Sequence, residues 1–488
     1  MVIESLKYKI LQQFGFAPTQ EQGQALDTFV SFLTDRDPQA VMILRGSAGT
    51  GKTSLSGAIV RTLLQIRQKV MLLAPTGRAA KVFSLGSGAP AYTIHRRIYR
   101  EKAFAGVDGQ FSLNDNLYTD TLFMVDEASM IANMGLGGTT FGSGCLLDDL
   151  VKFVYQGHND RLLLIGDKAQ LPPVGEEESP ALSASVMEGY GLKVYECDLN
   201  EVLRQSQSSG ILYNATLIRQ MITHDAVTGL PLIRFKGFAD IVMMPGAELV
   251  ESLGDSYHHV GMDETMVITR SNKRANIYNN GIRNMVLDRE EELSSGDMLM
   301  IVKNNYFWTE KEKKESGEGS AGAVPAFLAN GDRAKVLRVS NYIELYGFRF
   351  ATLLLQLPDY DDYEMQVTGM LDTLQSEAPA LTHEQQEELF RQVEEDYQHF
   401  VPLKADRMKS IRQDAYFNAL QIKYAYAVTC HKAQGGQWAH VYVDQGYMTD
   451  DMLTPDYIRW LYTAFTRATD KLFLVNWPKE QTCEPTDL

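Results

Sequence analysis

Residues 41–53 read VMILRGSAGTGKT, an apolar run followed directly by a glycine-rich loop. The continuous apolar run is typical of a β-strand that is buried on both faces. From about Thr53 to Gln65 the sequence has the pattern of a helix. A strand, a loop of the form G-x-x-x-x-G-K-[ST] and a helix, in this order, predict a phosphate-binding loop.

The chemistry of this loop predicts a nucleotide site. Gly46, Gly49 and Gly51 allow backbone N–H groups to curl around a phosphate. Lys52 can reach the β- and γ-phosphates, and the Thr53 hydroxyl can hold Mg²⁺, so we expect ATP and Mg²⁺ as ligands. The loop residues expected to contact ATP are Gly46, Ser47, Ala48, Gly49, Thr50, Gly51, Lys52, Thr53 and Ser54.

Further apolar runs alternate with helical patterns and predict two parallel sheets. Three runs that belong with the first strand lie at 69–75, 121–127 and 161–167. A second group of four lies at 239–245, 264–270, 439–445 and 470–476. We therefore predict an α/β protein.

Polar residues follow two strands of the first group. Asp126 ends the run TLFMV and is expected to hold Mg²⁺, directly or through water, and Glu127 is placed to orient or deprotonate an attacking water. Carboxylates after a strand can also simply cap the next helix, but the phosphate-binding loop upstream favours the metal site. The segment IGDKAQLPPVG adds Asp167 and Gln170 near the same phosphate.

The charge balance excludes a strongly basic coat protein for nucleic acid and a basic membrane-surface protein. The chain has 488 residues, with 46 Lys and Arg against 62 Asp and Glu, a net charge of −16. A local basic groove remains possible, because net charge is a sum over the surface. Residues 67–107 hold eight basic residues and one acidic residue, whereas residues 356–400 hold one basic and twelve acidic ones. We hypothesise that the acidic segment 356–400 points away from the candidate nucleic-acid track at 67–107 and either helps solubility or offers a surface to a basic protein partner.

The four cysteines suggest neither a disulfide framework nor a zinc ribbon, because they are far apart in the sequence. They are Cys145, Cys197, Cys430 and Cys483. The N-terminus lacks a signal-peptide core, and no apolar stretch approaches the 18 residues of a membrane span. We expect a cytoplasmic protein with no membrane association.

The pattern changes between the two halves of the second group of strands. Residues 324–358 alternate like a small antiparallel barrel, with turns at Asn330-Gly331 and Tyr346-Gly347. Residues 382–414 look helical and highly charged.

Six segments, in chain order, resemble motifs I to VI of the superfamily 1 helicases. They are GSAGTGKT, VDEAS, GDKAQLPPVG, LNEVLRQ, TCHKAQG and YTAFTRA. The QLPPV form of the third segment resembles the 1B branch, the RecD/Dda type. The resemblance implies an ATP-dependent DNA helicase that moves 5′→3′ on single-stranded DNA and separates duplex DNA.

The resemblance also implies a domain organisation of two tandem RecA-like motor domains with two insertions. Motor domain 1A is expected at 1–95 and 122–200, the hairpin subdomain 1B at 96–121, motor domain 2A at 201–302 and 415–488, and an SH3-like subdomain 2B with an acidic helical extension at 303–414.

By the same resemblance, individual residues acquire expected roles. Gln22 resembles the residue that reads adenine, and Gln170 resembles the γ-phosphate sensor. Arg204 and Arg467 resemble the two arginines that stabilise charge on the γ-phosphate. Gln437 stands where the family commonly has a glutamate that binds the ribose, which puts sugar discrimination in doubt.

The expected partners are single-stranded DNA and single-strand/duplex junctions, bound by a monomer without sequence readout. The segments APTGRAAK and TIHR resemble motifs Ia and Ib. The expected DNA contacts are Pro75, Thr76, Arg78, Thr93 and His95 in the first motor, and Thr269, Asn272, Thr429, His431 and Lys432 in the second.

A hairpin is predicted with its tip at 106–109, flanked by Phe104 and Phe111. Its position matches the strand-separating pin of relatives, so either phenylalanine is a candidate to stack on the base at the fork. Both could instead hold the hairpin against its own domain. The glycine-rich stretch 134–144 is expected to be a mobile surface loop, with a DNA-responsive element near the ATPase site as the alternative.

Three alternative functions remain open at this point. The first is an RNA helicase of the same branch, and the second is a single-strand translocase that remodels protein without unwinding. The third is a phosphate-loop nucleotide-binding module that does not act on nucleic acid.

Overall fold

The computed structural model describes residues 2–105, 108–135, 142–201, 208–223, 229–316, 324–325, 327–401, 403–449 and 452–483. Residues 2–4, 101–105, 108–110 and 316 are described by their backbone alone. The chain packs as two compact units. The first comprises Met1–Pro245 and Ala433–Leu488, and the second comprises Gly246–Lys432. The predicted domain boundaries are finer than this division and stay predictions.

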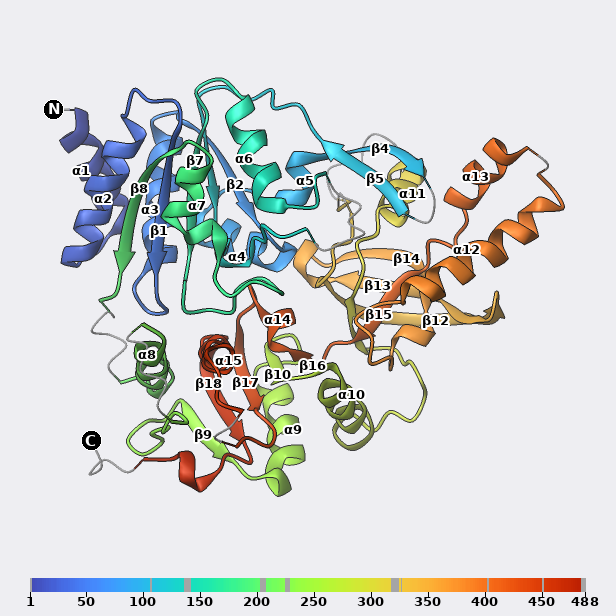
Figure 1. The fold of residues 1–488 in the computed structure, drawn as a ribbon. Coiled ribbons are helices and arrows are strands. Elements are labelled where there is room, and N and C mark those ends of the chain that lie inside the picture. Colours follow the sequence, from blue (N-terminus) through green and yellow to red (C-terminus); the bar gives the residue numbers. More distant parts are fainter. Residues whose placement is uncertain are drawn as a thin grey trace. The chain divides into compact units, whose positions relative to one another are not determined.

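A six-stranded parallel sheet forms the centre of the first unit (Figure 1), in the order β3-β2-β6-β7-β1-β8. Its strands are β1 (Ala40–Gly46), β2 (Lys69–Ala74), β3 (Ala91–Thr93), β6 (Thr121–Val125), β7 (Arg161–Gly166) and β8 (Lys193–Leu199). The four apolar runs predicted for this sheet are β1, β2, β6 and β7. The structure adds β3 and β8 at the two edges, where the sequence is less apolar.

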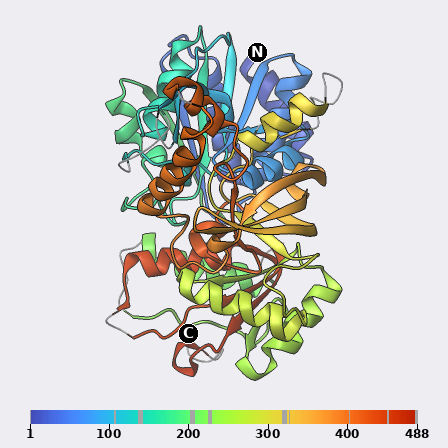
Figure 2. The same ribbon diagram turned by 90° about the vertical axis from the view of Figure 1, so that its right-hand side faces the viewer.

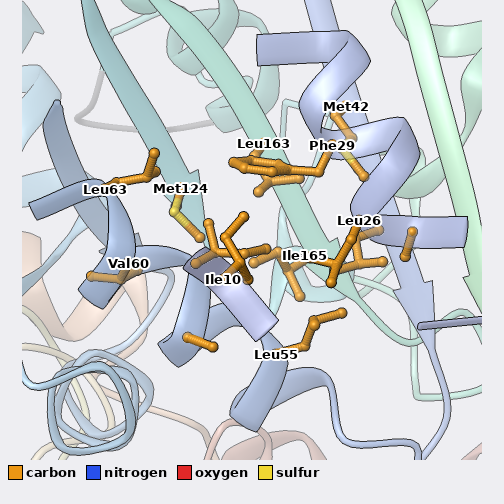
Figure 3. Packing of buried hydrophobic residues seen from close by; sticks show 14 of the residues in the cluster. Ile10, Leu26, Phe29, Met42, Leu55, Val60, Leu63, Met124, Leu163 and Ile165 are labelled. Carbon is orange, nitrogen blue, oxygen red and sulfur yellow. The ribbon is translucent and has the colours of Figure 1, made fainter. Parts of the chain in front are cut away.

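Alternate residues of each strand face opposite cores, which is why these strands are apolar throughout. Met42 and Leu44 of β1 belong to one core and Val41 and Ile43 to the other. Figure 3 shows the first core around Ile10. Helices α1 (Val2–Phe14), α2 (Gln20–Leu33), α3 (Lys52–Gln65) and α4 (Gly77–Ser87) contribute to this core, and α5 (Ile94–Ile98), α6 (Leu146–Gln156) and α7 (Ala184–Gly189) to the opposite one.

The predicted hairpin forms from β4 (Tyr99–Ala105) and β5 (Asp108–Leu113), which pair antiparallel. Residues 106 and 107 at its tip lie outside the described residues. Phe111 is half-buried and packs against the second core of the sheet.

The C-terminal part of the first unit contains three more parallel strands in the order β17-β18-β9. They are β9 (Ile241–Met244), β17 (Trp438–Asp444) and β18 (Ala468–Val475), accompanied by α8 (Gly210–Thr223) and α15 (Pro455–Phe465). Three of the four runs predicted for the second sheet are these strands. The fourth is β10 (Thr265–Thr269), which pairs in parallel with β16 (Ala427–Thr429) in the second unit.

A closed five-stranded barrel dominates the second unit (Figure 2). It consists of β11 (Met298–Ile301), β12 (Arg333–Leu345), β13 (Phe348–Leu357), β14 (Tyr363–Met370) and β15 (Leu420–Tyr424). The predicted turn at Tyr346-Gly347 joins β12 and β13, with φ of 56° and 74° as a type I′ turn requires. The sequence pattern at 324–358 revealed β12 and β13 alone, so β11 and β15 lie outside the range predicted for subdomain 2B.

The helices of the second unit are α9 (Leu249–His259), α10 (Asn272–Gly281), α11 (Phe307–Ser316), α12 (His383–Gln398), α13 (Lys404–Arg412) and the four-residue α14 (Cys430–Ala433), which reaches the first unit. The predicted helical segment 382–414 is the pair α12 and α13, which extends from the barrel as a helical hairpin (Figure 1). Among the described residues, no helix is long and apolar enough to cross a membrane.

A buried ionic cluster holds the first barrel strand. The Asp297 carboxylate, which is fully buried, accepts hydrogen bonds from Arg283 Nε at 3.0 Å and from Arg289 Nη1 at 2.6 Å. The Tyr426 hydroxyl donates to the same carboxylate at 2.7 Å. Removing Asp297 would therefore leave two arginines without their buried counter-charge.

We expect Asp297→Ala to lower the free energy of unfolding by about 3–5 kcal/mol, because a broken buried pair leaves an uncompensated charge. Asp115→Ala is the matched control, since Asp115 pairs with Arg100 at 3.1 Å on the surface, and it should cost about 1 kcal/mol or less. Chemical denaturation measures both. Equal losses in the two variants would contradict the assignment.

The stability of the barrel should also depend on pH through Asp332, just before β12. Burial raises the pKa of Asp332 to about 7, against the lowering effect of its hydrogen bonds from Tyr360 and the Ala329 N–H. The folded state therefore holds this proton more tightly than the unfolded state, and its stabilising contribution is complete below pH 4 and is lost as the pH rises through 7. In Asp332→Asn, melting temperatures measured between pH 4 and 8 should lose this part of the slope, and an unchanged slope would contradict the prediction.

Candidate functional site

The predicted phosphate-binding loop lies between β1 and α3, and its backbone requires glycine. Gly49 and Gly51 adopt φ of 77° and 79°, a region that favours glycine. A Cβ at Gly46 would come within 2.8 Å of Lys52 Cγ. The Lys52 ammonium donates to the carbonyl oxygens of Gly46 and Ser47, so the side chain lies along the phosphate-binding loop.

Gln22 lies beside this loop and is 1% exposed. Its Nε2 donates to Thr50 O at 2.9 Å, and its Oε1 accepts the Thr19 N–H at 3.0 Å in the capping box of α2. In this arrangement the side chain supports the loop and the helix. The adenine contact expected of it stays a proposal.

The carboxylates Asp126 and Asp167 follow β6 and β7, two adjacent strands of which β7 also pairs with β1. The Asp126 carboxylate accepts the Glu127 N–H at 2.9 Å. Burial and the neighbouring Glu127 carboxylate raise the pKa of Asp126, while Lys52 lowers it in part. A cation beside Asp126 would stabilise the ionised carboxylate, which burial disfavours. The Asp126 carboxylate and the Thr53 hydroxyl are oxygen donors of the kind that Mg²⁺ prefers.

Arg467 reaches the same place from the end of α15. Its Nη1 lies 4.0 Å from Glu127 Oε1. The guanidinium is 2% exposed and donates to Thr463 O at 3.1 Å and Gly436 O at 3.1 Å, so its direction is fixed. Arg204, the other expected arginine, lies outside the described residues.

Two residues that received no role from the sequence also contact the phosphate-binding loop. Arg219 of α8 donates to Ser47 Oγ at 3.0 Å and to the Asn200 side-chain oxygen. Tyr462 of α15 accepts the Ala48 N–H at 3.0 Å. Tyr462 lies within the segment YTAFTRA, which could have drawn attention to it, but Arg219 lies between the recognised segments and no sequence signal marks it.

Arg78, an expected DNA contact, makes two contacts with the segment near Trp438, and its role at DNA stays a proposal. Its guanidinium stacks 4.5 Å from the centre of the Trp438 ring, and its Nη2 donates to Gln437 O at 2.6 Å. The loop that contains Gly435 and Gln437 also packs closely against Thr76. A Cβ added at Gly435 would lie 3.0 Å from Thr76 Oγ1. Arg78 therefore braces the loop, and the Gln437 side chain is exposed beside it.

The other expected DNA contacts of the first unit lie at helix starts. Thr76 and Thr93 cap α4 and α5 by accepting the N–H of Ala79 and of Arg96, and the half-buried Pro75 precedes the first of these caps. Burial lowers the pKa of His95 to about 4. The His95 ring is therefore neutral near pH 7 and can offer hydrogen bonding or stacking, but no charge.

In the second unit, the Thr269 side chain is fully buried, and its hydroxyl donates to Ser271 O at 3.1 Å, so it supports the end of β10. The DNA contact expected of Thr269 stays a proposal. Asn272 begins α10, and Thr429 lies half-buried at the end of β16. His431 is exposed. The Lys432 ammonium donates to the Asn330 side chain, and burial together with the nearby Lys423 lowers the pKa of Lys432 to about 8.

Comparisons with known proteins agree with this site. The family described as AAA domain matches residues 17–229, and the family described as UvrD-like helicase C-terminal domain matches residues 424–475. The ATP-dependent RecD2 DNA helicase of Deinococcus radiodurans is 30% identical over a region that covers 32% of this chain and 18% of the relative's length. The ATP-dependent DNA helicase dda of Enterobacteria phage T4 is 25% identical over 53% of this chain and 55% of the relative's length. In these regions the chain is similar to helicases of the RecD and Dda type.

The extent of the likeness differs between the curated relatives. Protein R530 of Acanthamoeba polyphaga mimivirus is 22% identical over 90% of this chain and 96% of its own length. The chain spans 13%, 18% and 55% of the length of three other curated relatives that it matches.

We expect Arg219→Ala to raise the KM for ATP on the order of 10-fold, because it removes a charged donor from the rim of the phosphate-binding loop. Arg234→Ala is the control, since Arg234 stacks over Tyr213 and Phe238 in the same unit. Steady-state ATPase assays measure both, and a KM equal to that of the control would contradict a nucleotide role for Arg219.

Proposed function

We propose that this protein is an ATP-dependent DNA helicase of superfamily 1B that moves 5′→3′ along single-stranded DNA and separates duplex DNA. The observation that carries the proposal is the approach of Arg467 to Glu127, 4.0 Å apart, beside a formed phosphate-binding loop. A carboxylate that acts on water and an arginine from the C-terminal part of the unit are the two groups that ATP hydrolysis needs beyond nucleotide binding.

In the proposed reaction, the loop N–H groups and Lys52 bind the phosphates of ATP. Glu127 orients or deprotonates the attacking water, and Lys52 and Arg467, with Arg204, stabilise charge on the transferring phosphoryl group. Asp126 and Thr53 would hold Mg²⁺, which neutralises phosphate charge when bound.

The DNA-binding part of the proposal rests on the basic stretch 67–107 and the caps at Thr76 and Thr93. Hydrolysis changes the grip of the two motors in turn, which gives stepwise movement. The alternatives are an RNA helicase, for which the 2′-hydroxyl is the distinguishing group, and a translocase that does not unwind.

The strand-separating pin stays a proposal, and Phe104 is now favoured over Phe111 as the residue that stacks on the base at the fork. Phe111 packs against the core of its own unit, as the alternative interpretation expects, and its carbonyl accepts the Gly142 N–H at 2.8 Å. The Phe104 side chain lies outside the described residues and is the remaining candidate.

A basic partner for segment 356–400 is likewise proposed. Six of the twelve acidic residues of this segment lie on α12, and the exposed ones among these six are Glu384, Glu387, Glu395 and Asp396. The protein is proposed to act as a cytoplasmic monomer.

ATP hydrolysis should rise when single-stranded DNA is added, more with poly-dT than with poly-U, and duplexes with a 5′ tail should be unwound in preference to those with a 3′ tail. Arg467→Ala should lower kcat for ATP on the order of 1,000-fold. Arg391→Ala, a surface arginine paired with Glu388 at 2.7 Å, is the control. Hydrolysis without any response to nucleic acid would contradict the helicase proposal, and equal unwinding of both tails would contradict the polarity.

A further inference from the structure

The hydroxyl of Tyr462 joins two segments that are far apart in the sequence. Tyr462 lies on α15 and is 1% exposed. Its O–H donates to Asp167 Oδ2 at 2.6 Å, and its oxygen accepts the Ala48 N–H at 3.0 Å. One hydroxyl therefore connects the segment after β7 to the phosphate-binding loop.

The next residue of α15 holds the far end of the same segment. Thr463 Oγ1 accepts the Leu171 N–H at 2.9 Å. Gln434 Nε2 donates to Leu171 O at 2.7 Å. The stretch from Asp167 to Leu171 is thus fixed at its first residue by Tyr462 and at its last residue by Thr463 and Gln434.

Gln170 lies inside this fixed stretch. The Asp167 carboxylate also accepts the Ala169 N–H at 3.0 Å, and Asp167 O accepts the Gln170 N–H at 3.3 Å, so the turn that carries Gln170 is built on Asp167. The Gln170 side chain is 5% exposed, and its Oε1 has no hydrogen-bond partner among the described residues. A buried acceptor without a donor destabilises the folded protein unless a ligand or a water molecule donates a hydrogen bond to it.

We propose that Tyr462 is a positioning residue for ATP hydrolysis, which fixes Asp167 against the Ala48 N–H and thereby aims the Gln170 amide at the γ-phosphate or its attacking water. The inference rests on the proposed ATPase. Burial and Asp167 raise the pKa of Tyr462 well above its ordinary value, so its hydroxyl keeps the proton that it donates throughout the working pH range.

Tyr462→Phe tests the inference, because it removes the hydroxyl and keeps the ring. The matched control is Tyr457→Phe, since Tyr457 is a buried tyrosine of the same helix whose hydroxyl donates to Gln445 Oε1. We expect Tyr462→Phe to lower kcat on the order of 10-fold, with the KM for ATP and the melting temperature within the range of the control. Asp167→Asn should reproduce the loss.

A second measurement distinguishes positioning from a general structural effect. If Tyr462 acts through Gln170, then Tyr462→Phe should have little further effect on kcat in a Gln170→Ala background. A full additional loss in that background would overturn the inference, as would a kcat equal to that of Tyr457→Phe or a rise in KM without a fall in kcat. Absence of ATPase activity in the unaltered protein would instead reject the proposed function.

Discussion

Parallel pairing of β6, β7 and β1 is the constraint on which the candidate site depends. The register pairs Arg45 with Gly166 and Val125 with Leu164, so the three strands end at the same edge of the sheet. The phosphate-binding loop, Asp126 and Asp167 emerge there side by side. Because both faces of the strands are buried, a change of register would break two cores at once, and the packing therefore holds the chemical groups in place.

The helix α15 adds the second half of the site. Tyr462 and Thr463 of this helix, and Arg467 just after it, contact Asp167, Leu171 and Glu127. These pairs are separated by about 300 residues of sequence. A movement of α15 has to break or remake these bonds, which gives a physical route by which events at the phosphate could be transmitted to the C-terminal part of the chain.

The second unit depends on a different kind of constraint. Its barrel closes because β15, which follows the long helical hairpin, pairs with β11 antiparallel and with β14 parallel. The alternation of residues predicted β12 and β13, which are long and joined by a tight turn. The four-residue β11 and five-residue β15 carry too short a pattern to be recognised alone, and they become strands because the barrel supplies their partners.

The phosphate-binding loop, the apolar strands of the sheets and the hairpin could be predicted from the sequence, because glycine conformations and strand periodicity are local properties. It also placed Asp126, Glu127 and Arg467 near one another through their motifs. Only the tertiary structure decided that Arg78 braces a loop, that Thr269 faces inward, and that Arg219 and Tyr462 reach the phosphate-binding loop. Each of these depends on which distant segment supplies a hydrogen-bond partner, and packing alone settles that choice.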